Sequence, residues 1–144
     1  MANPIKIKKG LNIPLKGEAE KVISTPELPE TFSIKPPDFY GLRVKLLAKK
    51  GDEVKAGSPL FYDKLNSEKV LYTSPVSGEI ADVIRGPKRK ILEVRILADK
   101  EFKYEEFGAA DPNDISAEEV REKMMKGGLW PFFTRRPFSK VPPA

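Results

Sequence analysis

The side chains available for chemistry in this 144-residue chain are restricted, because it contains neither cysteine nor histidine. Without thiolates it has no ligands for iron–sulfur clusters, and without imidazole it lacks the commonest general base and transition-metal ligand. An independent catalytic centre would have to use carboxylates, lysines or hydroxyl groups. Three features are candidates for modification or binding: the lysines Lys64 and Lys69, a basic cluster at residues 85–90, and an aromatic and basic tail at residues 129–138.

The two lysines lie between GDEVKAGSPLF at residues 51–61 and SPVSG at residues 74–78, stretches that resemble parts of biotinyl and lipoyl domains. In such carriers the modified lysine lies at the apex of a β-hairpin. We place the hairpin tip at residues 65–67, which contain no lysine. The sequence therefore favours a scaffold of the biotinyl or lipoyl type that has no modified lysine. A carrier modified on Lys64 or Lys69 is the alternative.

The basic cluster, Arg-Gly-Pro-Lys-Arg-Lys at residues 85–90, is the densest positive run in a chain with a net charge of +5. Such a run is typical of a solvated turn, and attraction to an acidic partner or an anionic membrane is the next interpretation. A basic nucleic-acid-binding barrel is a further alternative, which predicts affinity that falls steeply with salt. The cluster has no aromatic neighbours in sequence for base stacking, so we expect no nucleic-acid partner.

Short alternating runs separated by glycine and proline turns predict the elements that carry these groups. The 14 prolines are about twice the average usage and favour many short strands over a helical bundle. Gly51 is expected to take a positive φ in a turn. The fold class is mainly β, a small barrel or sandwich. Strands are expected at residues 5–8, 42–46, 60–62, 70–72, 79–84 and 91–96, with short edge pairings at 22–23 and 32–34.

The C-terminal third differs from the β region in composition. Ser116 and Glu119 are spaced as a capping box, which predicts a helix at about residues 116–126 that ends at Gly127-Gly128. Residues 102–107 alternate as a strand or an extended arm. The aromatic and basic tail contains the candidate interface residues, because aromatic side chains and arginine dominate buried contacts between proteins. These residues are Trp130, Phe132, Phe133, Arg135, Arg136 and Phe138.

We divide the chain into an N-terminal strand and connecting segment (residues 1–38), a β core (39–99), and a C-terminal part (100–144) with an arm, the helix and a linker. The linker is expected to lead into a downstream domain, with folding back of the tail onto the β core as the alternative. No run approaches the roughly 20 apolar residues of a membrane span, and residues 1–14 lack the apolar core of a secretory signal. We therefore expect a soluble, cytoplasmic chain.

Three stretches together resemble one family: IKIKKGLNIP at residues 5–14, the central motifs with residues 85–89, and GLW at 128–130 leading to RRPFSKVP at 135–142. They are similar to the N-terminal part of the NqrA family, the peripheral subunit of the bacterial Na⁺-translocating NADH:quinone oxidoreductase. They are more distantly similar to the RnfC family of the related Rnf electron-transport complex. The Rnf relative carries cysteine motifs, so the absence of cysteine favours the Na⁺-translocating enzyme.

The resemblance implies a barrel-sandwich hybrid module of the biotinyl/lipoyl type. It implies a non-catalytic structural part of a peripheral subunit, on the cytoplasmic side of the bacterial inner membrane. The whole complex oxidises NADH, reduces ubiquinone and pumps Na⁺, and its flavins lie in other subunits. The implied partners are sister subunits and the downstream domain, with contact of Trp130 or Phe132 with ubiquinone as an alternative. We expect no catalytic, cofactor-binding or metal-binding residue in this part.

Overall fold

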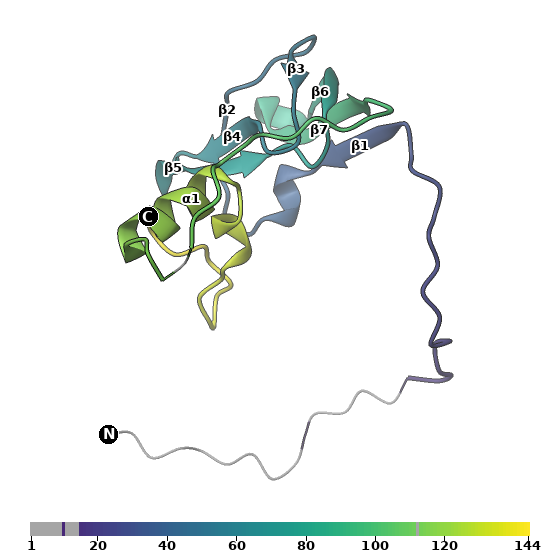
Figure 1. The fold of residues 1–144 in the computed structure, drawn as a ribbon. Coiled ribbons are helices and arrows are strands. Elements are labelled where there is room, and N and C mark those ends of the chain that lie inside the picture. The colour runs from purple at the N-terminus through teal and green to yellow at the C-terminus, as the bar shows by residue number, and fades with distance from the viewer. Residues whose placement is uncertain (1–9, 11–14, 112) are drawn as a thin grey trace.

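The computed structural model describes residues 10, 15–111 and 113–144, and it has two antiparallel β-sheets with helix α1 beside them (Figure 1). One sheet has the strand order β1, β7, β6, β3, and the other has the order β2, β4, β5. The prediction of a mainly β fold is confirmed. The bounds are Thr31–Ile34 (β1), Val44–Leu46 (β2), Glu53–Val54 (β3), Pro59–Asp63 (β4), Ser67–Thr73 (β5), Gly78–Arg85 (β6), Ile91–Ala98 (β7) and Ala117–Lys126 (α1).

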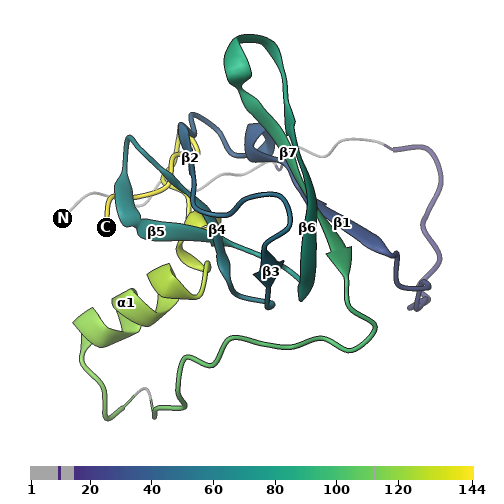
Figure 2. The same cartoon turned by 90° about the horizontal axis from the view of Figure 1, so that it is seen from above.

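The hydrophobic core lies between the two sheets, because alternating residues of each strand point inward. In β7 the buried residues are Ile91, Val94 and Ile96. Phe61 of β4 is fully buried and stacks on Tyr72 of β5, with ring centroids 4.9 Å apart. Strands β6 and β7 form a long hairpin whose turn projects past the rest of the body (Figure 2). The basic cluster therefore lies at a protruding tip.

The two motif stretches lie side by side and are joined through their backbones. The N–H of Ser74 donates to the carbonyl of Ser58 at 2.8 Å, and the N–H of Gly57 donates to the carbonyl of Ser74 at 2.8 Å. The buried hydroxyl of Ser77 accepts a hydrogen bond from the N–H of Lys103 at 2.8 Å. The hydroxyl of Ser74 donates to a carbonyl two residues further on at 2.6 Å. These buried serines therefore stabilise the turns of the motif stretches.

The hairpin between β4 and β5 turns one residue earlier than predicted. Strand β4 ends at Asp63 and the turn occupies residues 64–66, whereas the sequence pattern places the tip at residues 65–67. The carboxylate of Asp63 accepts a hydrogen bond from the N–H of Leu65 at 3.0 Å, and this Asx-type contact starts the turn at once. Lys64 therefore lies within the turn, which corrects the expectation that the tip contains no lysine.

The capping box of α1 is confirmed. The hydroxyl of Ser116 accepts a hydrogen bond from the N–H of Glu119 at 3.3 Å, and the Glu119 carboxylate accepts one from the N–H of Ser116 at 2.9 Å. The Glu119 carboxylate accepts hydrogen bonds from the N–H and also from the hydroxyl of Ser116, and these lower its pKa because they favour its charged form. The helix ends at Gly127, followed by Gly128 with a φ of +73°. Local sequence signals are therefore sufficient to predict where this helix begins and ends.

Residues 102–111 form an extended arm, which is one of the two forms predicted for residues 102–107. Its backbone pairs with Ala56 through two hydrogen bonds, from the Ala56 N–H to Lys103 at 2.9 Å and from the Glu105 N–H to Ala56 at 2.8 Å. The hydroxyl of Ser58 also donates to the carboxylate of Glu105 at 2.8 Å. The arm therefore carries the chain along the motif turns to the start of α1.

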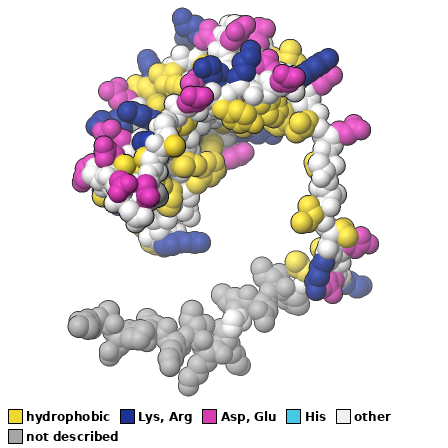
Figure 3. Space-filling view, viewed as in Figure 1, with side chains coloured by type: hydrophobic (Ala, Val, Ile, Leu, Met, Phe, Trp, Pro, Cys, Tyr) yellow, Lys and Arg dark blue, Asp and Glu magenta, His cyan; other side chains and the backbone are white. Residues whose placement is uncertain are grey.

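Residues 15–30 leave the body as an extended segment in which every residue is exposed (Figure 1). Both hydrophobic and charged side chains lie along it (Figure 3). The predicted pairing at residues 32–34 is confirmed in β1, whereas residues 22–23 form no strand, so that prediction is wrong. The predicted strand at residues 5–8 lies outside the described residues. In the described part of the chain, no helix is long and apolar enough to cross a bilayer.

Candidate functional site

The tail after α1 is anchored to the β core by Trp130. Its half-buried indole packs against the core, and its Nε1 donates a hydrogen bond to the carbonyl of Pro142 at 3.1 Å. Pro131 is buried next to it, and Val141 also packs on the core. Part of the tail therefore folds back on the β module, as in the alternative interpretation. Of the six candidate interface residues, Trp130 is the half-buried one.

The other candidate residues project outward. Phe132, Phe133 and Phe138 are 74%, 51% and 68% exposed. Arg135 and Arg136 are exposed, and the N–H of Arg135 donates to the carbonyl of Lys140 at 2.8 Å, which closes a short loop. No ion pair holds either arginine within the described residues. We call these five residues the aromatic tail surface. Large exposed aromatic side chains next to arginine are typical of protein interfaces.

An apolar groove of about 510 Å³ lies beside this surface. Of the two residues expected to contact ubiquinone in the alternative, Phe132 lines the groove, whereas Trp130 is not among its lining residues. The hydroxyl-bearing ring in the wall is Tyr72, whose pKa is raised to about 12 by burial and, to a lesser extent, by the carboxylate of Asp63. The remaining apolar lining is formed by Phe32, Ile34, Phe39, Pro75, Leu129 and Pro131.

The hairpin tip, where a carrier would hold its prosthetic group, is contacted by the tail at Asn66. The side-chain amide of Asn66 donates to the carbonyl of Pro142 at 3.0 Å, the same carbonyl that accepts from Trp130. Leu65, not a lysine, is at the centre of the turn, and Lys64 precedes it. The central residue of the turn is thus Leu65, whereas a biotinyl or lipoyl site would need a lysine there, and Lys64 lies one position before it.

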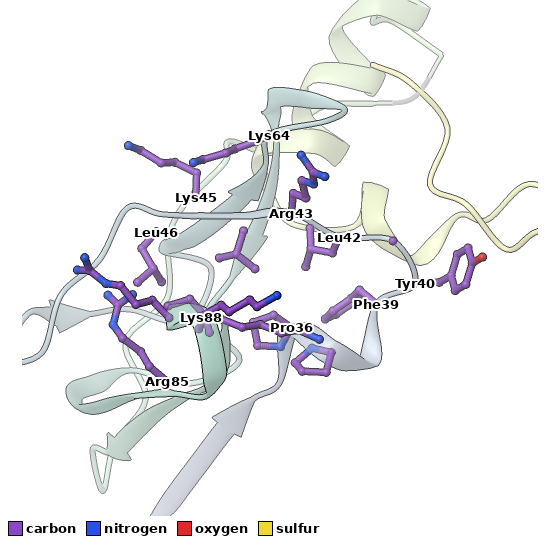
Figure 4. A pocket seen from close by; sticks show the side chains of 16 residues that line it. Pro36, Phe39, Tyr40, Leu42, Arg43, Lys45, Leu46, Lys64, Arg85 and Lys88 are labelled. Atoms are coloured by element: carbon purple, nitrogen blue, oxygen red, sulfur yellow. The ribbon is translucent and has the colours of Figure 1, made fainter.

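The sequence predicted only part of a second candidate surface, the basic cluster at residues 85–90. A cavity of about 1010 Å³ lies between residues 36–46 and the turn of the β6–β7 hairpin (Figure 4). Its lining includes Arg43, Lys45, Lys64, Arg85, Lys88, Arg89 and Lys90, together with Pro36, Phe39, Leu42, Val44, Leu46 and Ile91. We call this cavity the basic cleft. Arg43 and Lys45 alternate with apolar residues in the sequence, but their proximity to residues 85–90 depends on the fold.

The fold also removes one argument made from the sequence. Phe39 and Tyr40 lie far from the basic cluster in sequence, yet both line the basic cleft, and Tyr40 is 69% exposed. The absence of aromatic residues near the cluster therefore holds for the sequence but not for the structure. The described residues contain no group of three or more Asp and Glu side chains placed to hold a metal ion.

Comparisons with known proteins identify similar chains. A family model described as the NqrA N-terminal barrel-sandwich hybrid domain matches residues 5–99. The NqrA subunit of the Na(+)-translocating NADH-quinone reductase from Neisseria meningitidis serogroup A is 40% identical over 140 residues, which cover 96% of this chain and 31% of the relative. The same subunits from Marinomonas sp. (36% identity, 95% and 31% covered) and Glaesserella parasuis (35%, 96% and 31%) are also similar.

The match is therefore nearly complete for this chain and partial for its relatives. The chain spans about a third of the length of the curated relatives. The family model ends at residue 99, so it covers the two sheets but neither α1 nor the aromatic tail surface. The relatives' alignments extend over almost the whole chain, tail included.

Proposed function

The chain belongs to the family of the NqrA N-terminal barrel-sandwich hybrid domain, and from this premise we propose that it is a non-catalytic structural module of a peripheral NqrA subunit. The complex that it serves would oxidise NADH, reduce ubiquinone and transport Na⁺. The proposal is supported by relatives that are named as this component of a Na(+)-translocating NADH-quinone reductase and are 35% to 40% identical. The module binds no cofactor itself, and NADH, flavins and ubiquinone are handled elsewhere in the complex.

The observation that carries the structural function is the aromatic tail surface. Its three phenylalanines are more than half exposed, although the neighbouring Trp130 anchors the same segment to the core. Removing such rings from water in an interface provides most of the binding free energy of protein contacts. We propose that the surface packs against the downstream domain or a sister subunit on the cytoplasmic side of the inner membrane. Arg135 and Arg136 pair with carboxylates there.

The test uses the whole natural NqrA protein in its complex. A triple variant, Phe132→Ser, Phe133→Ser and Phe138→Ser, is expected to reduce co-purification of NqrA with the other subunits at least tenfold. In the isolated 144-residue chain the same changes should alter the free energy of unfolding by less than about 1 kcal/mol, because the rings are exposed. Co-purification at the wild-type level, with normal turnover, would contradict the proposal.

A matched control changes exposed apolar residues elsewhere. Leu65 and Tyr104 are 63% and 65% exposed and lie outside the aromatic tail surface. The Leu65→Ser and Tyr104→Ser variant is expected to assemble normally. If the triple variant assembles normally but its KM for ubiquinone rises, the groove beside Phe132 contacts quinone, and the alternative is correct.

A further inference from the structure

The basic cleft concentrates positive charge, and its lining contains no negative charge. Seven lysine and arginine side chains line it, and the lining contains no carboxylate. Within the described residues, none of the seven side chains forms an ion pair or a hydrogen bond. The residues outside the described ranges contain no Asp or Glu that could supply a partner. The cleft therefore has a net positive potential that favours an anionic ligand.

The turn that supplies three of these charges has an unfavourable backbone. Lys88 and Arg89 have φ values of +54° and +59°, and the N–H of Lys90 donates to the carbonyl of Pro87 at 3.2 Å. Two central residues with positive φ define a turn of type I′ geometry, for which Asn-Gly is the preferred pair. Residues with a larger side chain are disfavoured in this conformation. The turn itself therefore does not explain why lysine and arginine occupy these positions. Backbone strain of this kind is typical of binding sites.

The cleft also has apolar walls and a free strand edge. Arg43, Lys45 and Lys64 lie on one side and Lys88 on the other, with Leu42 and Leu46 between them (Figure 4). Strand β2 is the edge strand of its sheet, and in the described structure its second edge has no partner strand. Such an edge can accept an added strand through backbone hydrogen bonds.

We propose that the basic cleft binds an extended acidic segment of another protein, in which apolar and acidic residues alternate. The segment adds to β2, its acidic side chains meet the lysines and arginines, and its apolar side chains cover Leu42, Val44 and Leu46. A peptide can supply all three kinds of contact, whereas a lipid surface supplies negative charge but no strand partner for β2. A nucleic acid supplies no strand partner for β2. The proposal concerns a different surface from the aromatic tail surface and does not depend on it.

The test measures binding of a fluorescein-labelled peptide, Asp-Val-Glu-Ile-Asp-Val-Glu, to the whole natural protein that contains this chain. The control peptide replaces Asp and Glu by Asn and Gln. The acidic peptide is expected to bind at least tenfold more tightly than the neutral one, with affinity that falls as salt is raised. Lys45→Glu is expected to weaken binding at least tenfold. Lys100→Glu, a change of equal charge at an exposed lysine outside the cleft, should leave it unchanged.

A double variant, Lys88→Asn with Arg89→Gly, separates binding from folding. It is expected to raise the thermal midpoint of the 144-residue chain, because Asn-Gly suits the turn, and to weaken binding of the acidic peptide at least fivefold. Loss of binding together with a raised midpoint excludes misfolding as the cause. Unchanged peptide affinity in this variant and in Lys45→Glu would overturn the proposal. The proposal would also be overturned if phosphatidylglycerol vesicles or a single-stranded oligonucleotide bound more tightly than the acidic peptide and lost that binding in the same variants. Such a result would identify a lipid or nucleic-acid site.

Discussion

Two glycines with positive φ have different surroundings, and this difference determines what each contributes to the fold. Gly78 has a φ of +151° and lies where a Cβ atom would collide with the backbone carbonyl of Leu97 on β7. Gly51 has a φ of +88°, and a Cβ there would meet open space. The sequence predicts the turn at Gly51, and its positive φ is confirmed. The close approach at Gly78 becomes visible only when β6 is paired with β7.

Alanine at these two positions gives a matched pair of variants. Gly78→Ala is expected to lower the free energy of unfolding by about 3 kcal/mol or more, because the backbone of β7 must move. Gly51→Ala is expected to cost about 1 kcal/mol, from the backbone conformation alone. Urea unfolding of the 144-residue chain measures both. Equal effects of the two substitutions would show that the approach of Leu97 is not as close as described.

Tyr72 should make the stability of the domain depend on pH in the alkaline range. Its folded pKa is about 12, whereas an unfolded tyrosine titrates near about 10. The folded state holds the proton more tightly, so this contribution to stability is complete below about pH 10 and is lost as the pH rises toward 12. The loss at pH 12 would be about 2 to 3 kcal/mol.

The measurement compares the wild type with Tyr72→Phe by urea unfolding at pH 8, 10, 11 and 12. Above about pH 10 the unfolding free energy of the wild type should fall relative to that of Tyr72→Phe, because the variant has no ionisable group at this position. Tyr104→Phe, at a tyrosine that is 65% exposed, is the control and should follow the wild type. Parallel curves for Tyr72→Phe and the wild type would contradict a raised pKa.

At the scale of elements, the tail and the β4–β5 hairpin depend on each other. The carbonyl of Pro142 accepts hydrogen bonds from both Trp130 and Asn66, so one backbone group joins the tail, its anchor and the hairpin turn. This arrangement could not be predicted, because it brings together three segments that are distant in sequence. The capping box and the strand positions could be predicted from the sequence, since they depend on residues within a few positions of each other.

Trp130→Ala is therefore expected to affect the hairpin as well as the tail. The free energy of unfolding should fall by about 2 kcal/mol, because a half-buried ring is removed. The amides of residues 64–66 should exchange hydrogen faster, because the tail no longer restrains the turn. Hydrogen exchange read by mass spectrometry measures this, and Phe138→Ala, at a ring that is 68% exposed, is the control. Unchanged exchange at the turn would show that the tail does not restrain it.

At the scale of the whole molecule, the structure combines a carrier-like scaffold with a tip that does not suit a carrier. The motifs GDEVKAGSPLF and SPVSG build adjoining turns through the paired backbones of Ser58 and Ser74. The tip presents the exposed side chain of Leu65 at its centre, and the tail contacts it at Asn66. The lysine within the turn, Lys64, is the reason that the carrier alternative needs a direct test.

Co-expression with biotin and lipoyl ligases provides that test. The intact mass of the purified chain should equal the mass calculated from its sequence, because neither ligase finds a lysine at the apex. A biotinyl domain expressed in the same cells is the positive control. A biotinyl or lipoyl adduct on Lys64 or Lys69, located by peptide mass spectrometry, would contradict the interpretation of a scaffold without an arm.

The sequence by itself determined the features that depend on neighbouring residues: the mainly β class, most strand positions, the capping box at Ser116 and Glu119, and the family resemblance. Only the tertiary structure decided which distant residues meet. The hairpin turn starts one residue early because of a carboxylate contact, and Trp130 is anchored while three phenylalanines remain exposed. Turn and cap preferences act over a few residues, whereas the basic cleft exists because sheet pairing brings residues 36–46 to the β6–β7 turn.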